Sequence, residues 1–270
     1  MSADRLDARD AIVSIERLGV SFSTDAGAVK AVDDVSLHVN RGEVLAIVGE
    51  SGSGKTVTAK TILGLLPETA TASGAVILSN REGTRRQDVV SLDAKQLRAV
   101  RGTDVAMVFQ EPSTALNPVY TVGWQIAEGL RAHGGEFTKQ EARAKAIEVL
   151  RLVGIPDPPE ERVDHYPHQF SGGQKQRIVI AMALVLDPGL IVADEPTTAL
   201  DVTVQAEILD LLRNLRDEFG TAIVLITHNM GVVADLATGS PSCTRQRRRA
   251  GRRAHALRVA AERLHRTSLL

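Results

Sequence analysis

A glycine-rich stretch, GESGSGKT, occupies residues 49–56 of this 270-residue chain. An unbroken apolar run, Val44–Val48, precedes it and is short enough to form a strand buried on both faces. The segment Ala59–Leu66, which Pro67 ends, is predicted to form a helix. Strand, glycine-rich turn and helix are the context in which the pattern G-x-x-x-x-G-K-[ST] indicates a phosphate-binding loop rather than an ordinary turn.

This loop combines several sources of attraction for an anion. Its glycines let the backbone curl so that successive N–H groups point at one phosphate. The following helix adds unpaired N–H groups and the positive end of its dipole. Lys55 adds a formal charge, and the Thr56 hydroxyl is a candidate ligand for Mg²⁺. The candidate nucleotide-binding residues of the loop are Gly49, Glu50, Ser51, Gly52, Ser53, Gly54, Lys55 and Thr56.

Length and composition fit one large α/β core, or a core with a small inserted lobe. Aromatic residues make up 3% of the chain, and aliphatic residues dominate, as suits helices packed on a parallel sheet. No apolar stretch approaches the ~20 residues that a membrane-spanning helix needs, and the polar segment 1–10 does not resemble a signal peptide. The single cysteine, Cys243, excludes an internal disulfide and fits a reducing cytosol.

Two adjacent acids end the apolar segment 190–193, which is predicted to be a buried strand. Open α/β sheets bind ligands at the carboxyl ends of their strands, and buried acids there are costly unless they hold a cation or move a proton. Because side chains alternate along a strand, we expect Asp194 to face Mg²⁺ and Glu195 to face the water that attacks a γ-phosphate. A solvated acidic pair is the alternative.

Three other residues are candidates for the same site. Gln110 follows the predicted strand 105–109, and its amide can reach Mg²⁺ or an attacking water, although a glutamine there is often only solvated. His228 follows the predicted strand 222–226 and can hydrogen-bond a γ-phosphate oxygen, although a lone histidine is more often structural. Phe22 is either a core residue or a ring on which a purine stacks.

A second glycine pair precedes another predicted helix, Ile178–Leu186. Ser171, Gly172, Gly173 and Gln174 present bare backbone donors to an anion, but one nucleotide already has its loop at residues 49–56. This second anion site is therefore surplus unless it contacts another phosphate, and a capped helix N-terminus without a ligand is the equal alternative.

The remaining periodicity divides the chain further. Amphipathic helices at Gly123–Ala132 and Lys139–Val153 predict a helical lobe inserted into the α/β core. Thr138 is the expected N-cap of the second helix. Outside the core, strands are expected at Ile12–Leu18, Val35–Val39, Ala75–Ser79 and Val89–Leu92.

The complete set resembles the ATP-binding subunit of an ABC transporter over residues 12–237. The motifs match in order and spacing: residues 49–56 as Walker A, Gln110 as the Q-loop, residues 170–174 as the LSGGQ signature with Phe170 for leucine, residues 190–194 as Walker B, Glu195 as the catalytic carboxylate, residues 199–201 as the D-loop, and His228 as the switch histidine. Residues 109–118, 166–169 and 195–205 further resemble the dipeptide, oligopeptide and nickel import branch.

The resemblance implies a P-loop NTPase core, with a mainly parallel sheet and flanking helices, over residues 1–110 and 170–237. An N-terminal antiparallel β subdomain belongs to this core, and residues 111–169 are the inserted helical subdomain. The implied cofactors are ATP and Mg²⁺, with Thr56, Gln110 and Asp194 as metal ligands. Glu195, His228 and Gln110 are the implied catalytic residues. Besides the loop, nucleotide-binding residues are Phe22, Ser171, Gly172, Gly173, Gln174 and Asp201.

The implied partners are a second ABC ATPase subunit, placed head to tail, and two membrane permease subunits that contact the helical subdomain near Gln110. An extracytoplasmic solute-binding protein takes part indirectly, and no nucleic acid is expected. The subunit would lie peripherally on the cytoplasmic face of the membrane. Two alternatives stay open: a soluble ABC-type ATPase of nucleic-acid maintenance, and a truncated, non-functional remnant that lacks the family's strand pair after residue 237.

Residues 238–270 depart from the family pattern. They hold nine arginines and one acid, which leaves 23 basic and 32 acidic residues in the rest of the chain. One possible coding of residues 237–244, read two bases later, gives the Asp-Arg-Val-Ala-Val-Met-Tyr that the family has at this point. We therefore interpret this segment as a frameshifted tail. Little apolar surface and many like charges predict that it is disordered, with at most a short helix at residues 254–264, and that its removal changes stability little.

Overall fold

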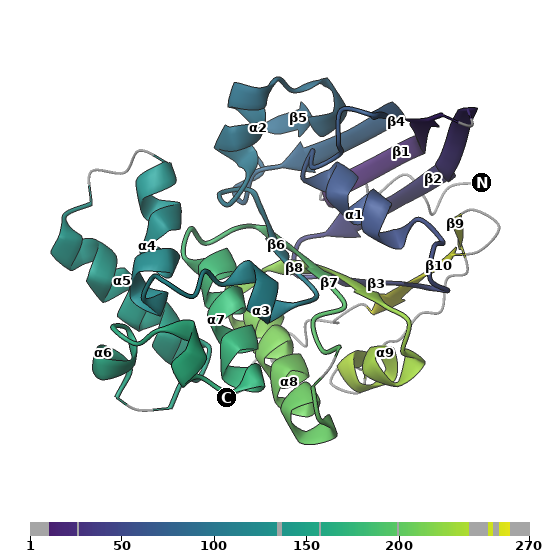
Figure 1. Ribbon diagram of the computed structural model, residues 1–270. Coiled ribbons are helices and arrows are strands. Elements are labelled where there is room, and N and C mark those ends of the chain that lie inside the picture. Colours follow the sequence, from purple (N-terminus) through teal and green to yellow (C-terminus); the bar gives the residue numbers. More distant parts are fainter. Residues whose placement is uncertain are drawn as a thin grey trace, which may run out of the picture.

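The computed structural model describes residues 11–25, 27–133, 137–156, 158–198, 200–237, 248–250 and 254–259. Its strands form two sheets (Figure 1). The first is antiparallel, in the order β2-β1-β4-β5, and consists of β1 (Ala11–Thr24), β2 (Gly27–Asn40), β4 (Ala70–Ser79) and β5 (Arg86–Asp88). The second contains six strands in the order β6-β7-β8-β3-β10-β9. The predicted α/β fold is confirmed.

Four strands of the second sheet are parallel neighbours: β6 (Val105–Val108), β7 (Leu190–Asp194), β8 (Ala222–Thr227) and β3 (Val44–Gly49). Their apolar runs are continuous because both faces of the sheet are covered. In β3, Ala46 belongs to one buried cluster while its neighbour Ile47 belongs to the other. Since parallel strands share their direction, the residues that follow all four strands meet at one edge of the sheet.

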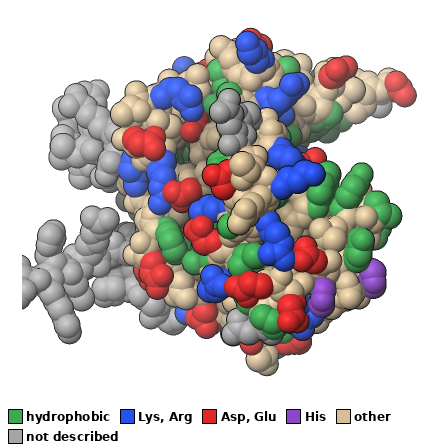
Figure 2. Space-filling view, turned by 90° about the vertical axis from the view of Figure 1, so that its left-hand side faces the viewer, with side chains coloured by type: hydrophobic (Ala, Val, Ile, Leu, Met, Phe, Trp, Pro, Cys, Tyr) green, Lys and Arg blue, Asp and Glu red, His purple; other side chains and the backbone are tan. Residues whose placement is uncertain are grey.

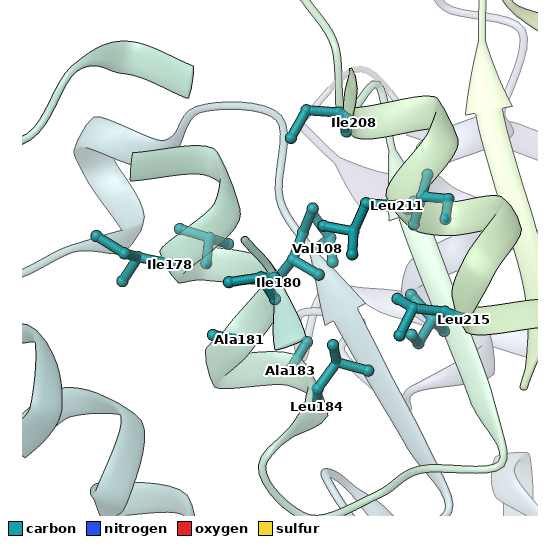
Figure 3. Close-up of a cluster of buried hydrophobic side chains, with 14 of the residues drawn as sticks. Val108, Ile178, Ile180, Ala181, Ala183, Leu184, Ile208, Leu211 and Leu215 are labelled. Carbon is teal, nitrogen blue, oxygen red and sulfur yellow. The ribbon is translucent and has the colours of Figure 1, made fainter. Parts of the chain in front are cut away.

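Helices cover one face of this sheet and form the larger buried cluster with it. Figure 3 shows Val108 of β6 between side chains of α7 and α8, including Ile180 and Leu211. The helices that contribute to this cluster include α4 (Val122–Ala132), α5 (Lys139–Leu152), α7 (Gly172–Leu184), α8 (Val202–Phe219) and α9 (Met230–Ala237). On the other face, α1 (Lys55–Ile62) and the antiparallel sheet enclose the second cluster.

The segment between β6 and α7 contains short and long helices, of which α4 and α5 lie on one side of the molecule (Figure 1). Besides α4 and α5 they are α3 (Pro112–Ala115), α6 (Pro159–Arg162) and the 3₁₀ turn η3 (Pro167–Gln169). Thr138 caps α5 as expected, through a capping box with Glu141. The remaining helix, α2 (Ala94–Val100), follows the first sheet and begins with a capping box at Asp93.

Two helices begin earlier than the apolar pattern predicts. The helix α1 starts at Lys55 and ends at Ile62, where Gly64 (φ 63°) forms a Schellman turn: the Gly64 N–H donates to Thr61 O and the next N–H to Lys60 O. The helix α7 starts at Gly172, so the glycine pair lies in its first turn. Glycine and serine favour helix starts over helix interiors, so apolar periodicity begins only after them.

The strand expected at Val89–Leu92 is wrong. The structure places a 3₁₀ turn, η2, at Val89–Ser91, directly after β5. The Asp88 side chain accepts hydrogen bonds from the Val90 N–H and the Val76 N–H. One carboxylate therefore caps the turn and ties it to β4, which the apolar run alone does not reveal.

The part of the tail that the structure describes, residues 248–250 and 254–259, forms strands, and disorder of the rest stays a prediction. Within its described residues, β10 (Ala254–Val259) pairs antiparallel with all of β3, and β9 (Arg248–Ala250) pairs with β10. The short helix expected at 254–264 is therefore wrong for residues 254–259. The physical reason is that β3 presents a row of backbone N–H and C=O groups, which an extended segment of almost any sequence can pair. The rest of the tail lies outside the described residues.

This pairing predicts that the tail contributes to stability. A chain cut after Ala237 loses β10 and leaves the edge of β3 unpaired, so we expect its melting temperature to fall by a few degrees, at roughly 2–4 °C per kcal/mol lost. A chain cut after residue 259, which keeps both strands, is the matched control. Equal melting temperatures for the two shortened chains would contradict the pairing of β10 with β3.

Candidate active site

The phosphate-binding loop lies between β3 and α1, where the sequence predicted it. Lys55 is buried, and its ammonium donates to the carbonyl oxygens of Gly49 and Glu50, each at 2.7 Å, and lies 3.4 Å from Ser53 Oγ. The hydrogen-bond donors of the Lys55 ammonium are thus satisfied by groups of the phosphate-binding loop itself. These contacts hold the loop curled around the place where a phosphate would enter, which lowers the entropy lost on binding.

Gly54 shows why this loop requires glycine. Its φ is 87°, and a Cβ added there would lie 2.5 Å from the carbonyl oxygen of Ala31 in β2. Any side chain would therefore meet both an unfavourable backbone conformation and a clash with backbone. The first sheet thereby fixes the approach of the loop to the start of α1.

Asp194, the last residue of β7, is 6% exposed and contacts Thr56 of the loop. Burial raises the pKa of its carboxyl, the hydrogen bond with Thr56 opposes this rise, and the negative charge of Glu195 adds to it. A buried carboxylate beside a hydroxyl and a second carboxylate favours a cation. Carboxylate and hydroxyl oxygens suit Mg²⁺, so two of the three predicted metal ligands are brought together and fit this ion.

Glu195 has three side-chain partners. Thr198 Oγ1 donates to its Oε2 at 3.0 Å, Gln110 Nε2 donates to the same oxygen at 3.1 Å, and His228 Nδ1 lies 2.9 Å from Oε1. Burial tends to raise the pKa of Glu195, but hydrogen bonds from His228 and Thr198 and nearby positive charge lower it below its usual value. The carboxylate is therefore kept ionised, as a base must be.

The backbone of Glu195 is also unusual. Its φ is 49°, in the left-handed region that a non-glycine residue adopts at a cost, and its N–H donates to Ile226 O of β8 at 2.9 Å. Such outliers persist where the surrounding structure fixes them, and they gather at functional sites. Gln110 and His228 meet at this carboxylate. Gln110 was predicted to be both a catalytic residue and a Mg²⁺ ligand, and its role at the metal stays a prediction.

The second glycine pair is a well-capped helix start. Ser171 Oγ accepts from the Gln174 N–H, and Gln174 Oε1 accepts from the Ser171 N–H. A Cβ at Gly173 would lie 2.5 Å from Val204 of α8, whereas Gly172 faces open space. The helix α7 packs against α3, α4, α5 and β6, whereas α1, which follows the phosphate-binding loop, packs against strands of both sheets. The two glycine-rich helix starts therefore have different neighbours. Close packing thus accounts for Gly173 but leaves Gly172 available to a ligand.

Two other predicted nucleotide-binding residues are Asp201 and Phe22. Asp201 caps α8, because its side chain accepts from the Val204 N–H at 2.9 Å. Ala199 of the same loop lies outside the described residues. Phe22, in β1, is half-buried and packs against the second cluster, so its two predicted roles, as a core residue and as a ring that stacks on a purine, both stay open.

Sequence reasoning missed two features. Thr198 was not singled out, although a hydroxyl three residues after Glu195 is within reach when the chain turns there. The other feature is an exposed aromatic pair: the rings of Tyr120 and Trp124 stack at 4.1 Å between centroids, and the Arg131 guanidinium lies 4.8 Å over the Trp124 ring. Both tyrosine and tryptophan remain about two-fifths exposed, at 42% and 40%.

The fold and this loop define a P-loop nucleotide-binding protein. Residues 32–198 match the family described as ABC transporter. The chain is 49% identical over 228 residues to the dipeptide transport ATP-binding protein DppD of Bacillus subtilis, covering 84% of this chain and 66% of that protein. It is 50% identical to the probable peptide ABC transporter ATP-binding protein y4tR of Sinorhizobium fredii, over 84% and 66%. The chain belongs to the ABC transporter family.

A solved structure agrees with the fold. The dimeric structure of the ATP-binding cassette MJ0796 bound to ADP and Pi superposes with a TM-score of 0.70 at 31% identity, covering 83% of this chain and 90% of that one. The curated relatives are longer, since this chain spans about two thirds of their length. None of the helices in the described parts of the chain combines the length and hydropathy that a bilayer crossing requires.

The geometry of Lys55 predicts a specific loss. Lys55→Ala removes the charge and the donor that hold the loop, so we expect affinity for a fluorescent ATP analogue to fall about 10–100-fold, the size of one charged hydrogen bond. Lys95→Ala, at an exposed position of α2, is the control and should bind as the parent protein does. Unchanged affinity in Lys55→Ala would show that this loop does not hold the phosphates.

Proposed function

We propose that this chain is the ATP-hydrolysing subunit that powers import of peptides, or of a related solute such as nickel, through a membrane permease. The proposal rests mainly on one geometric observation: Thr198 donates a hydrogen bond to the Glu195 carboxylate and His228 lies 2.9 Å from it, at the sheet edge that also carries Lys55 and Asp194. The solute class rests on the relatives, which are named for dipeptide, oligopeptide and peptide transport.

Each residue has a defined task in this proposal. The loop 49–56 binds the phosphates of ATP, with the Lys55 ammonium at the outer ones, and Phe22 stacks against the adenine. Thr56, Asp194 and Gln110 would hold Mg²⁺, which would supply positive charge to neutralise the phosphates. Glu195 would accept a proton from the water that attacks the γ-phosphorus, the bond from this phosphorus to the bridging oxygen would break, and ADP would leave beside inorganic phosphate. His228 would hydrogen-bond a γ-phosphate oxygen.

A second subunit completes the site in this proposal. Ser171, Gly172, Gly173 and Gln174 of one copy would contact the ATP held by the loop of the other, with Asp201 at the interface. The open space at Gly172 supports this arrangement, because a phosphate can approach the backbone there. The dimeric ATP-binding cassette among the solved relatives supports it as well.

Permease subunits would contact the helical side of the molecule. Figure 2 shows this side, with acidic and basic side chains intermixed and apolar side chains gathered towards one edge. Exposed apolar residues of this segment include Val119, Tyr120, Trp124 and Tyr166. Aromatic residues exposed in this way are typical of protein interfaces. The subunit would then lie on the cytoplasmic face of the membrane, with a solute-binding protein acting on the permease from outside.

Hydrolysis provides the direct test. Glu195→Gln keeps the size of the side chain but removes its basicity, so we expect turnover of MgATP to fall about 100-fold or more while binding of a fluorescent ATP analogue persists. Glu161→Gln, outside the site, is the matched control and should keep the turnover of the parent protein. Equal turnover in Glu195→Gln and the parent protein would rule out Glu195 as the base.

A further inference from the structure

Thr198 carries a hydroxyl to which the proposed reaction gives no task. Its Oγ1 donates to Glu195 Oε2 at 3.0 Å, and its backbone N–H donates to the Glu195 carbonyl oxygen at 3.2 Å. Both hydrogen bonds close the same short turn, which follows β7. The hydroxyl and the carboxylate are therefore fixed to each other by local chain geometry, whatever the rest of the protein does.

The other two partners of the carboxylate come from distant segments. Gln110 follows β6 and is exposed, and His228 follows β8 with 61% of its side chain exposed. In the proposed reaction both have a second partner, since Gln110 turns to Mg²⁺ and His228 to the γ-phosphate. In that reaction, each of these two contacts with Glu195 would be weakened or lost when ATP is bound. Only the bond from Thr198 requires no rearrangement.

We propose that Thr198 is a positioning residue that holds the Glu195 carboxylate in its reactive orientation while nucleotide is bound. The inference rests on the proposed function of Glu195 as the base. A hydroxyl on Oε2 fixes the rotation of the carboxylate and leaves Oε1 as the oxygen that takes the proton from water. The turn also supports a backbone that is strained, with φ 49° at Glu195, so the side chain keeps its direction.

The test uses substitutions that separate the hydroxyl from the shape of the side chain. Thr198→Val removes the hydroxyl and keeps the volume, whereas Thr198→Ser keeps the hydroxyl. Thr103→Val is the control, because it also removes one side-chain hydrogen bond, from Thr103 Oγ1 to Ala99 O at 2.6 Å, far along the chain from Glu195. For each full-length variant, kcat and KM for MgATP, the Kd of a fluorescent ATP analogue and the melting temperature are measured.

We expect Thr198→Val to lower kcat about tenfold or more, because a misplaced catalytic group is costly, with KM and Kd unchanged. Thr198→Ser should restore most of the parent kcat, and Thr103→Val should retain it. In the Glu195→Gln background, Thr198→Val should cause no further loss, since there is no longer a base to position. Should Thr198→Val fail to fold, Thr198→Ala takes its place in every comparison.

Three results would overturn the inference. One is an unchanged kcat in Thr198→Val against an active parent protein. Another is a fall in kcat that is accompanied by a fall in nucleotide affinity and in melting temperature, because this would mean that Thr198 has a general structural role. The third is a further loss in the double variant, which would mean that Thr198 acts independently of Glu195. Absence of hydrolysis by the parent protein would instead overturn the proposed function, and this inference with it.

Discussion

The parallel pairing of β3, β8 and β7 is the constraint on which the site depends. It places the end of β3, which leads into the phosphate-binding loop, two strands from the acids that end β7. The strand between them ends at Thr227, directly before His228, and its Ile226 carbonyl oxygen accepts from the Glu195 N–H. Register therefore determines which polar side chains meet. If the register of β7 shifted by one residue, the side chains of Asp194 and Glu195 would each move to the other face of the sheet.

The two buried charges at this edge of the sheet, Lys55 and Asp194, are compensated to different extents. The ammonium of Lys55 is buried but bonded to two carbonyl oxygens of its own loop, so it carries no unsatisfied donor cost before a phosphate arrives. Burial raises the pKa of the Asp194 carboxyl despite its hydrogen bond with Thr56, and a cation beside it would relieve that cost. Of the two buried charges, Lys55 is therefore compensated by its own loop, whereas Asp194 is compensated only in part.

Much of this could be predicted from the sequence because apolar runs mark the strands and polar residues mark their ends. The edge position of Asp194, Glu195 and His228 follows from that pattern alone. Helix starts were less predictable, since glycine and serine in the first turn of α7 interrupt the apolar period. The contact from Thr198 depends on a left-handed backbone at Glu195, which no periodicity encodes. The strand β10 was missed because pairing with the open edge of β3 uses backbone N–H and C=O groups and does not require an apolar pattern in the sequence.

In the proposed arrangement, each site uses the phosphate-binding loop of one copy and the glycine pair of another. This arrangement is tested most directly by mixing two inactive variants, Lys55→Ala, which keeps its glycine pair, and Ser171→Arg, which keeps its loop. A mixed dimer contains one site with both parts intact. We expect the mixture to regain MgATP hydrolysis that neither variant shows alone. A mixture as inactive as its components, although the two variants associate, would contradict it.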